Sequence, residues 1–239
     1  MARGRVVTCV ARVPSDAAAV VRSGGDTTSP SGLQALTAAE LIEPAADLLG
    51  RAPLDAIGYA STSSAYAIGS DAEAAVVSRL SRQVGIPVLA TCASAVLALR
   101  LLDVERVALV DPPWFDAELN ELGAAYFQSE GFVVVSSTSA GLSRDPRRIE
   151  ATAVFEWTSR HVSDDAEAIF IGGNGFRAAG AIAPLEAAIG RPVLTSNQVL
   201  LWNLLAHAGA TFEVSRYGRL FRHKPPVARP VARERAGRP

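Results

Sequence analysis

The chain has 239 residues, 49% of them hydrophobic and 20% charged, which is typical of a globular protein with a sizeable core and excludes an extended disordered chain. Its formal net charge of -1 gives no general attraction for nucleic acid or an anionic membrane, so neither is expected as a partner. We expect it to bind small molecules or, as a homo-oligomer, further copies of itself.

Short β-branched runs alternate with longer Ala- and Leu-rich stretches of helical period, which predicts an α/β fold with mostly parallel sheets. Strands are predicted at Arg5–Ala11, Ala56–Ala60, Val88–Ala90, Val107–Val110, Phe132–Ser136, Ala168–Ile171 and Val193–Thr195. Helices are predicted at Leu36–Arg51, Asp71–Gly85, Ser94–Leu102, Ala117–Glu130, Arg147–Val162, Ala178–Gly190 and Gln198–Ala208.

Residue usage argues against several cofactors. The only lysine is Lys224, so the Schiff-base lysine of a pyridoxal phosphate enzyme and the lysine of a Walker phosphate loop are both lacking. The three histidines stand far apart without paired ligand spacing, and the two cysteines are not paired either. We therefore expect no cofactor and no metal site.

The chain is expected to be cytoplasmic. No apolar run approaches the ~20 residues of a membrane-spanning helix, and Arg12 interrupts the short apolar segment near the start. Cys9 and Cys92 make a poor disulfide framework, which fits a reducing compartment. Cys9 lies in the first predicted strand and is expected in the core.

Two segments of the chain echo one another. Gly85-Ile-Pro-Val-Leu-Ala-Thr-Cys resembles Gly190-Arg-Pro-Val-Leu-Thr-Ser-Asn, and Ala56-Ile-Gly-Tyr-Ala-Ser-Thr-Ser resembles Ala168-Ile-Phe-Ile-Gly-Gly-Asn-Gly. The alternative is that Gly-x-Pro-Val simply recurs wherever a helix is followed by a buried strand, but paired echoes in the same order favour a duplication. Two facing halves would place both small-residue loops on opposite walls of one cleft, at the carboxyl ends of their strands.

The predicted domains follow from this duplication. A first lobe spans residues 1–105 and a second spans 106–222, with a segment near 205–222 able to pack back on the first lobe. Residues 223–239 are rich in Pro and Arg without apolar periodicity, which predicts a disordered tail. An arm that packs on a neighbouring subunit is the alternative.

The first wall carries successive hydroxyl residues. Ser61, Thr62, Ser63 and Ser64 follow a predicted strand, where side-chain hydroxyls and backbone N–H groups can hold a carboxylate or oxyanion. The same residues suit a helix N-cap, and the two roles are compatible.

Several motifs together resemble a known family. They are Thr62-Ser63-Ser64-Ala65-Tyr66, Pro87-Val88, the run from Ala95 to Arg100, Arg106 to Leu109, and the closing Tyr217-Gly-Arg-Leu-Phe. In order and spacing they resemble the arylmalonate decarboxylase and maleate isomerase branch of the aspartate/glutamate racemase superfamily, over roughly residues 55–221. The resemblance implies two Rossmann-like lobes related by pseudo-twofold symmetry, a carboxylate held in the cleft between them, and an enediolate-like intermediate that a cysteine protonates without any cofactor.

The chain departs from the resembled pattern where the family carries its thiols. The first-wall cysteine position falls on Ser61, and the second-wall position falls on Gly173, or on Asn174 if the register shifts by one. Thr62, Ser63, Asn174 and Gly175 still provide hydroxyl, amide and backbone donors. The carboxylate cradle is therefore expected to remain although both thiols are replaced.

Three further residues are candidates for the cleft. Trp114 stands where the pattern has a tyrosine and is expected to cap the cleft with an apolar wall, or to be an ordinary core aromatic like Phe115. Cys92 follows a strand on the cleft side and can supply a displaced thiol, or be a small buried hydrophobe. Asn197, its counterpart in the echo, lies where it can line the same cleft.

Three functions follow as hypotheses. The first is a decarboxylase- or isomerase-like enzyme on a small carboxylic or dicarboxylic acid, with Thr62, Ser63 and Asn174 holding the carboxylate and Ser61, Cys92 or a water moving the proton. The second is a carboxylate-binding or regulatory protein that has lost catalysis. The third is a hydrolase or lyase in which Ser61 is the nucleophile.

Overall fold

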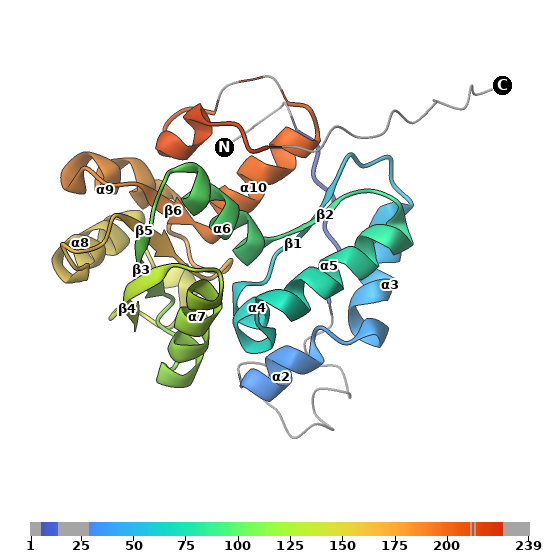
Figure 1. The fold of residues 1–239 in the computed structure, drawn as a ribbon, viewed down its shortest axis with the longest axis horizontal. Helices are drawn as coiled ribbons and strands as arrows, with labels where there is room; N and C mark the ends of the chain where they lie inside the picture. The colour runs from blue at the N-terminus through green and yellow to red at the C-terminus, as the bar shows by residue number, and fades with distance from the viewer. Residues whose placement is uncertain (1–5, 14–28, 211, 213, 227–239) are drawn as a thin grey trace.

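The structure is a computed structural model that describes residues 6–13, 29–210, 212 and 214–226 (Figure 1). The amino-terminal half forms α2 (Pro30–Ala35), α3 (Ala39–Gly50), β1 (Ile57–Tyr59), α4 (Thr62–Ile68), α5 (Ser70–Val84), β2 (Val88–Ala90) and α6 (Thr91–Leu101). The remainder forms β3 (Arg106–Asp111), α7 (Ala117–Ser129), β4 (Val133–Ser139), α8 (Ala151–His161), β5 (Ala168–Ile171), α9 (Ile182–Ile189), β6 (Val193–Thr195) and α10 (Ser196–His207).

The strands form two separate parallel sheets, which confirms the predicted α/β fold. β1 pairs with β2, and the larger sheet has the order β4-β3-β5-β6. Figure 1 shows the larger sheet with α7, α8 and α9 in one part of the molecule and the smaller sheet with α3, α4 and α5 in the other. Helices α6 and α10 pack on each other between them, and α10 also contacts both strands of the smaller sheet.

Strands β3, β5 and β6 of the larger sheet are buried on both faces, as is usual for parallel strands, whereas the edge strand β4 is partly exposed. Along β5, Ala168 and Phe170 belong to one core cluster, whereas Ile169 and Ile171 belong to another. This alternation follows from the two-residue period of a strand. One face packs against α6, α7 and α10, and the other packs against α8 and α9.

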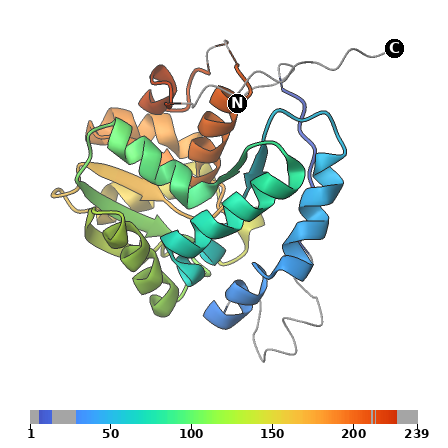
Figure 2. The same cartoon turned by 45° about the vertical axis from the view of Figure 1, so that its right-hand side comes forward.

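The smaller sheet has a core of its own. Apolar side chains of α3 and α5, among them Ile42, Val76 and Leu80, pack on Ile57 and Val88 of the two strands. The two helices lie side by side in both views (Figure 2).

The two echoing segments have the same local structure. Gly85 and Gly190 both end a helix in the left-handed conformation, with φ of +70° and +71°. In each echo, the backbone amide of the first strand residue donates a hydrogen bond to a side chain seven residues earlier. The Val88 amide donates to the Ser81 hydroxyl, and the Val193 amide donates to the Glu186 carboxylate. A helix then starts directly after each strand, at Thr91 and at Ser196.

The prediction of a first strand is wrong for residues 6–11. These residues form no strand in the described part of the chain. Val7 is 89% exposed, Val10 is 82% exposed, and Cys9, expected in the core, is exposed as well. Strand propensity reports how well a side chain fits a half-buried pleated surface, so β-branched residues alone do not form a strand without a paired neighbour. Arg5 lies outside the described residues.

Several helix boundaries differ from the prediction. α6 begins at Thr91 and α10 at Ser196, each earlier than expected, because the polar residues after the strand are the first helical residues. Residues 147–162 divide into a 3₁₀ turn at Pro146–Arg148 and α8, and residues 178–190 divide into a 3₁₀ turn at Ala179–Ala181 and α9.

The carboxyl-terminal segment packs on the second half of the chain. Tyr217 accepts a hydrogen bond from Gln198 of α10 through its carbonyl, and the Arg219 amide donates to Glu186 of α9. Leu220 is fully buried in the main core. Residues 227–239 of the predicted tail lie outside the described residues. In the described part of the chain, no helix is both long and apolar enough to cross a lipid bilayer.

Candidate active site

The two small-residue loops predicted to face each other are in direct contact. Asn174, in the loop after β5, accepts hydrogen bonds through Oδ1 from the Thr62 amide at 3.1 Å and the Thr62 hydroxyl at 3.0 Å. The Thr62 and Ser196 hydroxyls are 2.8 Å apart. The carboxyl ends of β1, β5 and β6 therefore meet at one point, as is usual for sites in parallel α/β proteins.

Two further side chains complete this cluster. Asn197 donates through Nδ2 to the Asn174 carbonyl at 2.9 Å and accepts from Asn174 Nδ2 at 3.1 Å. The Thr91 hydroxyl lies 3.3 Å from Asn174 Nδ2 and donates to the Tyr59 carbonyl at 3.3 Å. We call Thr62, Thr91, Asn174, Ser196 and Asn197 the polar cluster.

Three of these residues are the first residues of helices. Thr62 begins α4, Thr91 begins α6 and Ser196 begins α10. All three side chains are buried, at 1%, 0% and 1% exposure. Because unpaired N–H groups and the positive ends of helix dipoles gather at helix starts, the polar cluster favours a negative charge.

Sequence reasoning missed Thr91 and Ser196 as site residues. Each follows Pro-Val-Leu-x in one of the two echoes, so the repeat itself carries the signal. Tyr59 was missed as well: it ends β1, and its hydroxyl interacts with the hydroxyls of Ser64 and Ser61. Burial outweighs these bonds and raises the Tyr59 pKa, so the phenol is a neutral donor at physiological pH.

Ser61 is the N-cap of α4. Its hydroxyl accepts from the Ser64 amide at 3.3 Å and donates to the Ser64 hydroxyl at 2.8 Å. Ser64 is buried, whereas Ser63 is half-buried. The capping role suggested by the sequence is therefore present, and it positions Ser61 directly before Thr62 of the polar cluster.

Gly173 occupies a position that suits glycine alone. Its φ is +78°, and a Cβ built on it would collide with the Pro112 ring. A side chain at position 173 would therefore have a strained backbone and would collide with Pro112. Gly173 directly precedes Asn174 of the polar cluster.

Trp114 packs against the second-wall loop. Its ring meets Phe176 edge to face, with centroids 6.1 Å apart, and lies 3.5 Å from where a Cβ on Gly175 would stand. Trp114 is half-buried, whereas its neighbour Phe115 belongs to the main core. Trp114 therefore shields one side of the loop from water.

Cys92 is fully buried behind the first wall. Its sulfur lies 3.9 Å from the Thr62 carbonyl, one residue after Thr91. Burial, and then the nearby Glu73 and Asp111, raises its pKa well above the ordinary value. The group is a neutral thiol rather than a thiolate at physiological pH.

A buried set of ionisable groups, also missed by sequence reasoning, lies next to the cluster. The Tyr66 hydroxyl donates to Asp111 Oδ1 at 3.4 Å, and the Tyr126 hydroxyl donates to Glu73 Oε2 at 2.5 Å. Burial raises the pKa of Asp111 to about 8 and that of Glu73 to about 7. Both acids are fully buried.

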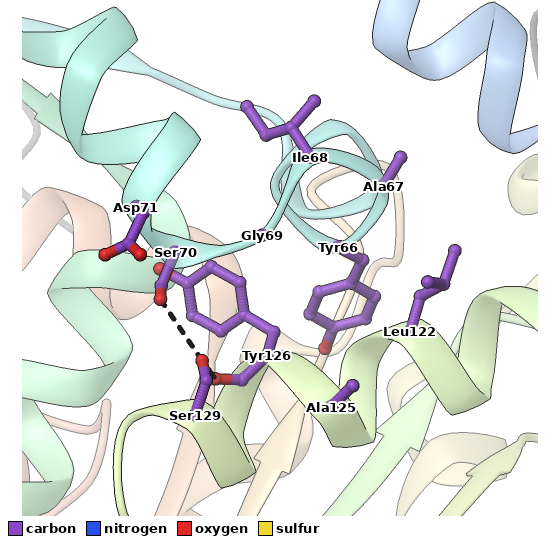
Figure 3. A pocket seen from close by; sticks show the side chains of 10 residues that line it. All are labelled: Tyr66, Ala67, Ile68, Gly69, Ser70, Asp71, Leu122, Ala125, Tyr126 and Ser129. Carbon is purple, nitrogen blue, oxygen red and sulfur yellow. Dashed lines mark hydrogen bonds between the residues drawn. The ribbon is translucent and has the colours of Figure 1, made fainter.

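A separate hollow of about 390 Å³ lies between the α4–α5 turn and α7 (Figure 3). Tyr66 and Tyr126 form part of its wall, and the Ser70 and Ser129 hydroxyls are 3.1 Å apart beside it. This hollow is distinct from the polar cluster, where the two loops touch. Within the described residues, no group of three or more His, Cys, Asp or Glu side chains could hold a metal ion.

Comparisons with known proteins agree with the observed fold. A curated relative, arylmalonate decarboxylase of Bordetella bronchiseptica, is 26% identical over 165 residues, covering 67% of this chain and 68% of the relative. A crystal structure of arylmalonate decarboxylase is similar with a TM-score of 0.73 and 24% identity, over 80% of this chain and 84% of that chain.

Maleate isomerases have the same fold. The enzyme of Pseudomonas putida S16 matches with a TM-score of 0.74 and 21% identity, over 81% of this chain and 79% of that chain. The maleate cis-trans isomerase of Nocardia farcinica matches with a TM-score of 0.73 and 24% identity, over 81% and 80%. The family model described as arylmalonate decarboxylase matches residues 24–221. This match covers most of the sequence, and the chain belongs to the arylmalonate decarboxylase family.

Proposed function

We propose that this chain acts on a small carboxylic or dicarboxylic acid through an enediolate-type intermediate, without a cofactor. Its family and its relatives make it a decarboxylase- or isomerase-like enzyme. Decarboxylation suits its residues best, because carbon dioxide leaves without a base and only one protonation remains.

The contact between Thr62 and Asn174 carries this proposal. The Asn174 side-chain oxygen accepts hydrogen bonds from the Thr62 amide and hydroxyl, with the Thr91 hydroxyl 3.5 Å away. A carboxylate oxygen could accept the same bonds and would add a full negative charge where three helices begin. The substrate carboxylate would therefore take the place of the Asn174 oxygen.

The same donors suit the intermediate. Loss of carbon dioxide leaves a second carboxyl group as an enediolate, whose oxygens carry more charge than those of the starting acid. Donors that are already oriented stabilise the developing charge more than they stabilise the substrate. Trp114 would exclude water from the carboxylate that leaves, which favours its loss.

A panel of malonates, maleate and small amino or hydroxy diacids tests the function. We expect carbon dioxide release, or solvent deuterium incorporation detected by NMR, from at least one member. Thr62→Val should reduce the rate at least 10-fold, whereas Thr37→Val, which alters an exposed hydroxyl that bonds to Gln34, should leave it unchanged. No turnover by the wild-type chain with any member would contradict the proposal.

A carboxylate-binding protein without catalysis is the second candidate. It is favoured by the resemblance, which implies that the family's thiol positions fall on Ser61 and Gly173, and by the burial of Cys92. Malonate binding measured by calorimetry, together with no turnover across the panel, would support this candidate instead. The Ser61 hydrolase is less well supported, since Ser61 bonds to Ser64 and lies beside Tyr59, and neither is a base at neutral pH.

A further inference from the structure

Asp111 lies at the carboxyl edge of the larger sheet, directly beside the second wall. It ends β3, and the neighbouring strand β5 continues into Gly172 and Gly173. The Gly172 amide donates to the Val110 carbonyl at 2.8 Å, and a Cβ built on Gly172 would collide with Asp111 Oδ1. The carboxyl group therefore rests against the backbone that leads into Asn174.

Asp111 is also joined to the first wall. The Tyr66 hydroxyl donates to Asp111 Oδ1, and Tyr66 stands four residues after Thr62 on α4. Residues spaced in this way lie on one face of a helix, about 5–6 Å apart. The Asp111–Tyr66 pair is therefore about one helical turn behind the Thr62–Asn174 contact.

The surroundings of Asp111 keep its carboxyl group neutral. Its ionisable neighbours are Tyr66 from α4 and Cys92 from α6, and burial keeps both of them protonated. Burial is the larger effect on Asp111 and raises its pKa to about 8, although the Tyr66 bond lowers it. Its Oδ2 atom is buried with no hydrogen-bond partner among the described residues, so the acid holds a proton that nothing else binds.

We propose that Asp111 is the proton donor of this site and protonates the carbon from which carbon dioxide has departed. This inference rests on the function proposed above. The bond from the α-carbon to the departing carboxylate breaks and its electron pair forms the enediolate. The carboxyl proton of Asp111 then bonds to that carbon as the electron pair returns to it, which leaves Asp111 as a carboxylate.

The immediate products of this step are the product carboxylate and ionised Asp111, with carbon dioxide already released, so charge and protons balance. The Tyr66 hydroxyl, which already donates to Oδ1, stabilises the carboxylate until a solvent proton restores the acid after product release. Ser61 and Cys92 are weaker acids than Asp111, because a hydroxyl and a fully buried thiol give up a proton far less readily. The step requires the α-carbon of the substrate to come within reach of Asp111 when the substrate carboxylate takes the place of the Asn174 oxygen.

Infrared difference spectroscopy at pH 7 tests whether Asp111 lies at the bound ligand. We expect a protonated-carboxyl band that is absent from Asp111→Asn and that shifts when malonate binds. The band of Glu73, identified with Glu73→Gln, is the internal comparison and should shift less, because Glu73 bonds to Tyr126 and to the Ala93 amide and not to Tyr66 or the Gly172 backbone. An Asp111 band that does not shift when malonate binds would overturn the proposal.

Turnover tests the proton transfer itself, with the panel member that the wild-type chain converts. Asp111→Asn should lower kcat at least 100-fold with little change in KM, as expected for loss of a general acid. The wild-type rate should fall as pH rises through about 8, and this fall should be absent from the residual rate of the variant.

The outcomes separate the two proposals. A wild-type chain that releases carbon dioxide while Asp111→Asn retains its rate would overturn the role of Asp111 alone. A wild-type chain that converts no member of the panel would overturn the function, and the proton transfer with it. If Asp111→Asn does not fold, the infrared spectra of wild-type protein and of Glu73→Gln still decide whether Asp111 responds to malonate.

Discussion

Thr62 and Asn174 are 112 residues apart in sequence, yet one side-chain oxygen of Asn174 accepts hydrogen bonds from both the amide and the hydroxyl of Thr62. This contact joins the starts of α4, α6 and α10 through Thr91 and Ser196. Its position makes it both a structural link and the expected place of the substrate carboxylate.

A double-mutant cycle on Thr62→Val and Asn174→Ala measures the strength of this link. We expect the two changes to be coupled by about 1 kcal/mol in the free energy of unfolding, which is the usual net value of a partly buried hydrogen bond. Urea denaturation of the four proteins measures the coupling. Strictly additive effects would show that the contact contributes nothing to stability.

A cysteine placed on each wall should have unequal effects. Gly173→Cys must adopt a φ of +78° and meet the Pro112 ring, so we expect it to lose about 2–4 kcal/mol of unfolding free energy. Ser61→Cys loses an N-cap acceptor and should cost about 1 kcal/mol. Thermal or urea unfolding measures both.

Gly131→Cys is the matched control that measures the cost of placing a cysteine at a positive φ without a steric contact. Gly131 has a φ of +90°, but nothing lies within 4 Å of the position that a Cβ would take there, so only the backbone strain remains. Gly173→Cys should therefore be clearly less stable than Gly131→Cys. Equal losses would mean that the Pro112 contact gives way easily and that the second wall can accept a thiol.

The sequence predicts β5 and β6 of the larger sheet well because each is a short, mostly apolar run that follows a turn, whereas β4 ends in Ser-Ser-Thr-Ser and extends beyond its predicted bounds. Ala168–Ile171 and Val193–Thr195 are found within the bounds expected from their composition alone. Residues 6–11 have the same local character but pair with no strand in the part of the chain that the structure describes. A single run of residues does not specify its pairing, so the two cases look alike in sequence.

The residues of the candidate site likewise fall into those that the sequence could predict and those that it could not. Thr62, Asn174 and Asn197 could be predicted because small polar residues after parallel strands gather at one edge. Asp111 could not, since Asp before Pro-Pro has the pattern of an exposed turn, and Glu73 has the pattern of a solvated helix face. Their burial depends on Tyr66 and Tyr126, which reach them from distant parts of the chain.

The two thiols should differ sharply in reactivity. Cys9 is exposed, whereas Cys92 is fully buried with a raised pKa, so a disulfide reagent should label one thiol quickly in the native protein. In Cys9→Ser, labelling of Cys92 should occur only as fast as the protein unfolds. Rapid native-state labelling of that variant would show that Cys92 reaches solvent and is able to act in the site.

Glu73 should make stability depend on pH. Its carboxylate accepts from Tyr126 and from the Ala93 amide at the start of α6, yet burial is the larger effect and raises its pKa to about 7. The folded state therefore holds the proton more tightly than the unfolded state. Its contribution is full below pH 4.5 and is lost as pH rises to about 7.

Comparison with Glu73→Gln isolates this contribution, because glutamine keeps the shape and does not titrate. Between pH 4.5 and 8, the unfolding free energy of the wild-type chain should fall relative to that of the variant, by on the order of 3 kcal/mol. Urea denaturation across this range measures the difference. A constant difference would mean that Glu73 is ionised in the folded protein throughout, with its charge balanced by the helix start that it caps.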